Sequence, residues 1–139
     1  MTASIREATM KDLRDMCASV KMSARDCDIM ERWYRNSSHD WAGFWDGKIA
    51  CVYGVMSPSL MSDEAYLWLI TNDLVKDHAF TFVRHSQIVV KELLKSYGLI
   101  RGHVQVGQIN SIQWLEWLGV KLMRHEIVND LIPFRIRSG

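Results

Sequence analysis

The sequence is poor in the residues and runs that mark disulfide scaffolds, long linkers and membrane spans. Three cysteines are present, at positions 17, 27 and 51, and no two form a Cys-x-x-Cys pair. Two prolines and eight glycines among 139 residues leave little room for long linkers. No apolar run approaches the ~20 residues that a membrane-spanning helix requires. We therefore expect free thiols in a reducing compartment and no membrane span.

An excess of charge of either sign is also lacking. Lys and Arg number 17 against 16 Asp and Glu, so the net charge is +1, and no run of five like charges occurs. This balance argues against nucleic acid as the main partner. The five histidines lack the spacing of metal ligands, so no metal site is expected. Arg6 and Glu7 lie where a secretion signal needs an apolar run, which favours a cytoplasmic location.

What is present is the composition of one globular domain. Apolar residues make up 48% and charged residues 24%, which indicates a packed core rather than disorder. A chain of this length buries roughly two thirds of its unfolded surface. We expect residues 1–139 to form a single domain. The six tryptophans are a high number; the simplest interpretation places them in the core, and the alternative is that some anchor a partner.

The first half of the chain predicts two helices followed by a hairpin. The residue types at Thr9–Asp12 have the spacing of a helix-capping box, and Ser23–Asp26 repeats the pattern before a second apolar stripe. Asp46-Gly47 then separates two segments rich in aromatic and β-branched residues, 41–45 and 48–55. Asp-Gly between apolar segments is typical of a tight β-hairpin, because both residues tolerate positive φ.

A central strand and a long helix are predicted next. Residues 65–71 contain few polar side chains, which indicates a strand buried on both faces. Residues 72–77 form a polar connector, and a helix that begins at His78 ends at Gly98 as its C-cap. The expected buried stripe of that helix is Phe80, Val83, Val90, Leu94 and Tyr97.

The rest of the chain predicts a strand, a short helix and two closing strands. Residues 102–106 alternate like a strand, and Asn110 or Ser111 is placed to cap a short apolar helix that Gly119 ends. Strands mixed with helices, with one tight hairpin and one helical crossover, indicate an α/β domain. We expect a central mixed β-sheet flanked by helices.

Residues 65–120 carry a resemblance to a known family. Ser111–Val120 begins with a serine-isoleucine pair and ends in leucine and glycine, and it resembles the late motif of the GCN5-related N-acetyltransferases (GNAT). Trp68–Thr71, followed by a long helix, is similar to that family's cofactor strand. With the glycine-free connector and Val104–Gly107, the pattern more closely resembles the GNAT-like internal virion protein A group of tailed podophages.

The resemblance implies acetyl-CoA as the cofactor, but the segment that would hold its pyrophosphate is altered. The family uses Arg or Gln, two residues, Gly, one residue, then Gly or Ala, because backbone N–H groups bind the phosphates there. In the corresponding window, Leu74–Ala79, Asp77 replaces the key glycine, and Asp73 lies just upstream. Two carboxylates argue against tight binding of acetyl-CoA. The cofactor-binding residues that the resemblance implies are Leu69, Ile70, Thr71, Lys76, His78 and Ala79.

The resemblance also places altered residues at the catalytic positions. Leu115 stands where the family has the tyrosine that protonates the leaving thiolate, and Gln108 corresponds to a strand-end asparagine. Glu64 and His103 are the remaining candidates for a general base, which needs both reach and a tuned pKa. The structural alternatives are a solvated charge at a strand end for Glu64 and a half-buried strand histidine for His103.

Three functions are compatible with the sequence. The leading hypothesis is a phage-encoded GNAT-fold protein of the internal virion type. It would act through contacts with a virion or host protein in the cytoplasm of the infected host or within the virion, and its acetyltransferase activity would be vestigial or absent. The second is an acetyl-CoA-dependent N-acetyltransferase with a divergent pyrophosphate loop. The third is a small phage regulator of a host protein, and a homo-oligomer is compatible with all three.

Overall fold

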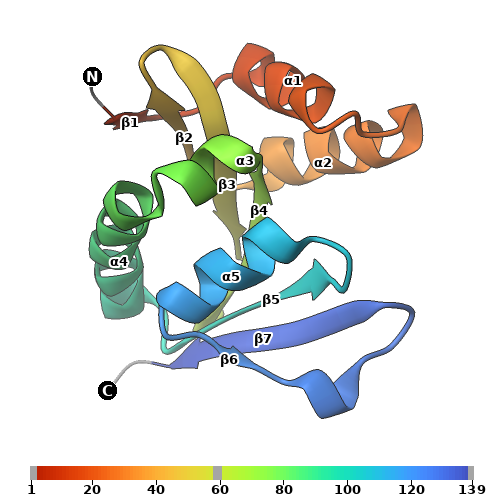
Figure 1. Cartoon of the computed structure of the whole chain (residues 1–139). Helices are drawn as coiled ribbons and strands as arrows, with labels where there is room; N and C mark the ends of the chain where they lie inside the picture. Colours follow the sequence, from red (N-terminus) through yellow and green to blue (C-terminus); the bar gives the residue numbers. More distant parts are fainter. Residues whose placement is uncertain (1–2, 58–60, 138–139) are drawn as a thin grey trace.

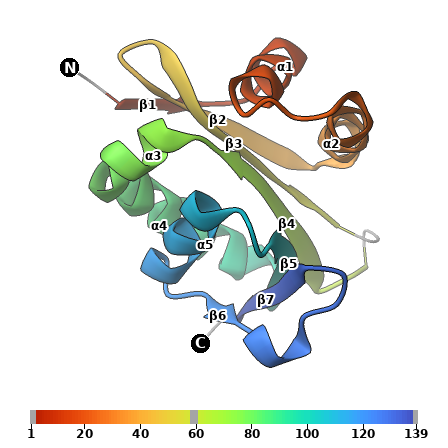
Figure 2. The same cartoon turned by 45° about the vertical axis from the view of Figure 1, so that its right-hand side comes forward.

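The computed structural model describes residues 3–57 and 61–137 and contains one seven-stranded sheet with helices on both faces (Figures 1 and 2). The mixed α/β class is thereby confirmed. The elements, in chain order, are β1 (Ala3–Arg6), α1 (Met10–Ser19), α2 (Ala24–Asn36), β2 (His39–Trp45), β3 (Lys48–Met56), β4 (Glu64–Thr71), α3 (Asp73–Asp77), α4 (Ala79–Ser96), β5 (Leu99–Gln105), α5 (Ile109–Trp117), β6 (Lys121–Leu122), a 3-10 turn (Arg124–Glu126) and β7 (Leu131–Arg137).

The sheet is mixed because one pair of its strands is parallel. Its order is β1-β2-β3-β4-β5-β7-β6, so β4 is the middle strand, as its apolar sequence predicted. All neighbours are antiparallel except β4 and β5, which the helix α4 connects. Their parallel ladder joins Glu64–Tyr66 to Leu99–Arg101, and it covers only the first part of each strand.

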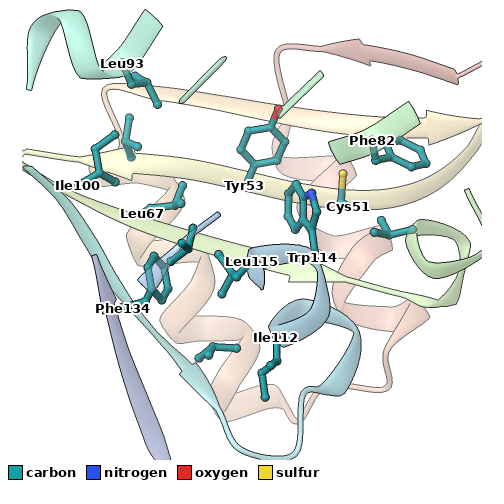
Figure 3. Close-up of a cluster of buried hydrophobic side chains, with 14 of the residues drawn as sticks. Cys51, Tyr53, Leu67, Phe82, Leu93, Ile100, Ile112, Trp114, Leu115 and Phe134 are labelled. Carbon is teal, nitrogen blue, oxygen red and sulfur yellow. The ribbon is translucent and has the colours of Figure 1, made fainter. Parts of the chain in front are cut away.

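Each face of the sheet has its own hydrophobic core. Helices α1 and α2 cover one face, where Trp68 of β4 and Leu13 of α1 are fully buried. Helices α3, α4 and α5 cover the other face, where Phe82, Trp114 and Leu115 pack against β3 and β4 (Figure 3). Alternating residues of β3 and β4 serve the two cores, and this explains why both strands are apolar throughout.

Local hydrogen bonds at the helix starts and the hairpin are those that the sequence predicted. The Thr9 side chain accepts from the Asp12 amide at 3.1 Å and Asp12 accepts from the Thr9 amide at 2.8 Å, which completes the capping box. Ser23 caps α2 by accepting from the Asp26 amide at 3.1 Å, without the return bond that would complete a capping box. Asp46 and Gly47, with φ of 50° and 79°, form the turn between β2 and β3.

The expected connector after β4 is wrong in one respect, because residues 73–77 form the helix α3. Asn72 is its N-cap and accepts a hydrogen bond from the Leu74 amide at 3.0 Å. Val75 is 1% exposed and packs into the core. A polar cap followed by one buried apolar residue is enough to stabilise a single turn against the sheet.

The predicted stripe of α4 is correct only in part, because Val83, Leu94 and Tyr97 pack half-buried against the core but Phe80 does not. Phe80 is 79% exposed, whereas Phe82, Ser86 and Leu93 are buried. Ser86 lies at the centre of the buried face. Because a serine breaks the apolar periodicity, the sequence pattern did not indicate this face. The helix ends at Tyr97 with an extended backbone, so Gly98 is not the left-handed cap that we expected.

The start of α5 is a further correction. Gln108 is the N-cap and makes no side-chain hydrogen bond, so Asn110 and Ser111 lie inside the first turn instead of capping it. Both side chains are used elsewhere, as described below. The helix ends as predicted, because Gly119 follows it with a φ of 80°.

Candidate ligand cleft between the ends of β4 and β5

A cleft lies where the two parallel strands stop pairing. The ladder ends after Tyr66 and Arg101, although β4 continues to Thr71 and β5 to Gln105. A cavity of about 560 Å³ lies between these strand ends, with the α1–α2 connection on one side and the start of α5 on the other. Open α/β sheets bind ligands at the carboxyl ends of their strands, and the cleft has that position.

A buried hydrogen bond fixes the floor of the cleft. The hydroxyl groups of Thr71, at the end of β4, and Ser111, in the first turn of α5, are 2.7 Å apart. Both residues are less than 10% exposed. Because α5 has no N-cap side chain, this bond is a main polar link between its first turn and the sheet.

The charges around the cleft are few and of both signs. Lys21 and Lys76 line it from opposite sides, and Asp26, in the first turn of α2, adds one carboxylate. Asn110 also lines it and donates to Asp73 at 2.7 Å, which ties α5 to the start of α3. A diphosphate in this cleft would meet two flexible lysines at most.

The turn at the entrance of the cleft uses its own backbone amides. The Leu74 amide donates to the Asn72 side chain, and the Val75 amide donates to the Asn72 carbonyl at 3.2 Å. The His78 amide donates to the Leu74 carbonyl at 3.1 Å. Asn72 is held in turn by Ser19 and the Ile49 carbonyl, at 2.8 and 2.9 Å. The Leu74, Val75 and His78 amides are therefore used within the turn and are not free to bind a ligand.

The residues proposed for cofactor binding separate into two groups. Ile70, Thr71 and Lys76 line the cleft, and Leu69 lines the hollow next to it. His78 stacks on Trp45, with ring centroids 3.6 Å apart, and Ala79 lines a groove between α4 and α5. Asp77 faces a third hollow beside Lys48, on the hairpin side of α3.

A second hollow of about 280 Å³ continues from the cleft along β4 and β5. His103 lies in it, and its Nδ1 atom is 3.1 Å from the Tyr66 hydroxyl. Trp33 of α2 meets the Tyr66 ring edge-on at 5.5 Å. Burial raises the pKa of Tyr66 above its ordinary value. Asp26 lines both the cleft and this hollow.

The sequence indicated His103 as a candidate general base but gave no signal for Tyr66, its hydrogen-bond partner. The pair forms because β4 and β5 are parallel neighbours, and their register brings residues 66 and 103 to the same face. Period-two alternation placed Tyr66 on one face of its strand, but only the strand pairing shows which residue it meets. Glu64, the other candidate base, lies at the opposite end of β4 and forms an ion pair with Arg101 at 3.7 Å.

The described residues can also be compared with the requirements of a metal site and of a membrane-spanning helix. Among residues 3–57 and 61–137, no three His, Cys, Asp or Glu side chains are grouped so as to hold a metal ion. No helix in the part of the chain that the structure describes has the length and apolar character to cross a membrane.

Solved structures from several bacteria are similar to this chain over nearly its whole length. The GNAT domain of S. lividans PAT matches with a TM-score of 0.64 at 14% identity, covering 99% of this chain and 92% of that one. An N-acetyltransferase from Staphylococcus aureus Mu50 gives 0.64 at 14%, covering 99% of both. The Brucella melitensis ribosomal-protein-alanine N-acetyltransferase gives 0.64 at 12%, covering 97% and 99%. The chain has the GNAT fold.

The likeness to GNAT proteins is one of fold alone, because the identities are low. No protein-family model and no curated protein matches the sequence. The GNAT fold and the mixed sheet that the sequence predicted are confirmed by these neighbours. Among the residues that the GNAT resemblance implies for cofactor binding, Ile70, Thr71 and Lys76 line the cleft between β4 and β5. In α3, the Leu74 and Val75 amides are bonded to Asn72 and are therefore not free to bind a phosphate.

Proposed function

We propose that this GNAT-fold protein acts through contacts with a protein partner during phage virion assembly or infection, and that its acetyltransferase activity is vestigial or absent. The observation that carries the proposal is the helix α3, which contributes Lys76 to the cleft and whose Leu74 and Val75 amides are bonded to its own N-cap, Asn72. A pyrophosphate in the cleft would meet Lys76 of α3 but neither the Leu74 nor the Val75 amide, because both are bonded to Asn72.

The phage setting rests on the sequence pattern. The strand Trp68–Thr71, the glycine-free connector 72–77 and Val104–Gly107 resemble the internal virion protein A group. On this proposal the protein works in the cytoplasm of the infected host and is carried in the virion. Its partner is a virion protein or a host protein.

An exposed apolar groove supports protein contact. Phe80 is 79% and Trp117 is 41% exposed, and both line a groove of about 650 Å³ between α4 and α5. Arg84 is its charged residue. Large aromatic side chains with an arginine are the residue types that anchor protein interfaces.

Association with virions tests the contact hypothesis. We expect Phe80→Ser to reduce the amount of this protein in purified particles without lowering its thermal midpoint, because Phe80 is exposed. Ile88→Ser is the matched control, since Ile88 is 57% exposed on the same helix and does not line the groove. Equal incorporation of both variants and the wild type would remove the groove from the proposal, and absence of the protein from particles would remove its virion role.

Thermal unfolding with acetyl-CoA tests the loss of cofactor binding. A ligand at 100 times its Kd stabilises the native state by about 2.7 kcal/mol, which raises the midpoint by several degrees. We expect no rise at millimolar acetyl-CoA. A rise of several degrees would refute the proposal that cofactor binding is lost and would favour the second candidate.

That second candidate is an acetyl-CoA-dependent N-acetyltransferase with a divergent phosphate loop. The continuity of the cleft with the hollow around Tyr66 and His103 favours it, because a thioester in the cleft and an amine in the hollow would lie side by side. Tyr66 and His103, which are joined by a hydrogen bond, would then act as general acid and base in the transfer. Acetyl transfer to a polyamine or peptide amine that disappears in His103→Ala would support this function over the first.

A further inference from the structure

Three polar atoms are buried in the core beneath α4 and α5. They are the hydroxyl of Tyr53 on β3, the hydroxyl of Ser86 on α4 and the indole N–H of Trp114 on α5. None of the three has a hydrogen-bond partner among the residues that the structure describes. Their residues are only 2–3% exposed. Leaving such groups unpaired costs free energy, so three together at one place require an explanation.

The three side chains line the same small cavity. Leucine and valine side chains of β4, α4 and α5 form the rest of its wall, and its volume is about 10 Å³. Figure 3 shows Tyr53 and Trp114 side by side between the sheet and α5, and their ring centroids are 5.5 Å apart. A cavity of this size holds roughly one water molecule and excludes organic ligands.

The chemistry of the three groups matches a single water. Burial raises the pKa of Tyr53 far above its ordinary value, and the nearby Ser86 hydroxyl offsets part of that rise. Tyr53 is therefore a neutral hydroxyl that both donates and accepts, and Ser86 is another. Trp114 can only donate, so the group that joins all three must accept from it and exchange hydrogen bonds with two hydroxyls.

We propose that this cavity binds one structural water, which accepts from the Trp114 indole and bridges the Tyr53 and Ser86 hydroxyls. The water ties together β3, α4 and α5, three elements that are distant in the sequence. Helix α5 also forms the floor of the cleft through Ser111. Trp114 lies three residues after Ser111, on the same buried face of α5, so the water site helps to position that floor.

The sign of one stability change tests this proposal. Ser86→Ala removes one partner of the water, so the equilibrium constant for unfolding should rise roughly threefold to tenfold. If Ser86 is an unpaired buried hydroxyl, the same change stabilises the protein. If Ser86 bonds to a carbonyl of its own helix, the change is nearly neutral. Either of the last two results would overturn the proposal.

A double-mutant cycle tests whether the groups share one partner. Tyr53→Phe removes the second hydroxyl with little change of shape, and its loss should be less than additive with that of Ser86→Ala. Tyr34→Phe is the matched control, because the Tyr34 hydroxyl donates directly to the Ala8 carbonyl at 3.0 Å on the other face of the sheet. Its combination with Ser86→Ala should be additive. Additive losses for the Tyr53 pair would contradict a shared water.

Nuclear magnetic resonance gives direct evidence. The indole proton of Trp114, assigned by its disappearance in Trp114→Phe, should show a cross-relaxation peak with a long-lived water in the folded protein. The peak should vanish in the Tyr53→Phe/Ser86→Ala double variant while the fold persists. A Trp114 indole proton without any such peak in the wild type would overturn the proposal.

Discussion

Single side chains at the end of β4 determine the shape of the cleft. Thr71 and Ser111 share a buried hydrogen bond of 2.7 Å that joins the central strand to the first turn of α5. Asn72, the next residue, caps α3 and also holds Ser19 and the Ile49 carbonyl. Two adjacent polar residues thus fix the floor and the entrance of the cleft, whatever binds there.

The bond between Thr71 and Ser111 is expected to contribute measurably to stability. Thr71→Val keeps the side-chain volume but leaves the buried Ser111 hydroxyl unpaired, at a cost of about 1–3 kcal/mol. Urea denaturation measures the loss. Thr71→Val with Ser111→Ala should cost less than the sum of the two single changes, because the second change removes the unpaired group. Additive costs would show that the two hydroxyls do not depend on each other.

Asp12 should contribute to the loss of folding stability of this protein at acid pH. Burial favours a raised pKa, but hydrogen bonds from Arg6 and Thr9 outweigh it, and the net pKa of Asp12 is lowered. A lowered folded pKa means that this stability is fully present above the unfolded value, about pH 4, and is lost as pH falls through the folded pKa.

The Asp12→Asn variant tests that dependence. We expect lower stability at pH 7 and a weaker decline between pH 5 and the acid limit than in the wild type, both measured by urea midpoints. Asp15→Asn is the control, because Asp15 forms an exposed ion pair with Lys11 that contributes little. An Asp12→Asn variant with an unchanged acid decline would contradict the assigned role.

At the scale of elements, the sequence predicted the long pieces and missed the short one. The Thr9 capping box, the Ser23 cap, the hairpin turn and the central strand carry local signals, and all appear in the structure. Helix α3 has five residues, too few for a helical period to show, and its formation depends on Val75 finding a place in the core. The buried Ser86 similarly misdirected the predicted face of α4.

The candidate site was predictable only in part for a related reason. Ile70, Thr71 and Lys76 follow from the position of β4 and its exit. The pairing of Tyr66 with His103 depends on the parallel register between β4 and β5, which no local pattern encodes. His78 was diverted from the cleft because the ring of Trp45 offers it a stacking surface.

Substitutions of Asp77, whose side chain lines the hollow beside Lys48, test whether α3 prevents a diphosphate from binding. Asp77→Asn removes a carboxylate and leaves the turn closed, whereas Asp77→Gly also loosens the backbone at the end of α3. We expect Asp77→Gly to bind acetyl-CoA more tightly than Asp77→Asn, as measured by titration calorimetry. Equal gains would show that charge alone is the obstacle, and no gain in either would remove this residue from the explanation.

At the scale of the whole molecule, the chain has the GNAT fold, but its sequence differs from the family's pyrophosphate-binding motif, with Asp77 at the position of the key glycine. The mixed sheet, the diverging central strands and the cleft between them are intact. Architecture of this kind is set by many burial contacts and tolerates low identity, whereas a phosphate cradle depends on a few backbone amides. We therefore expect the protein to combine a GNAT fold with an entrance that does not hold a diphosphate.

The crystal structure of the protein grown with millimolar acetyl-CoA tests that claim most directly. We expect α3 to keep its capped turn, with Asn72 bonded to the Leu74 amide, and no diphosphate to be ordered in the cleft. A diphosphate bound by amides of residues 74–79 beside Lys76 would contradict it.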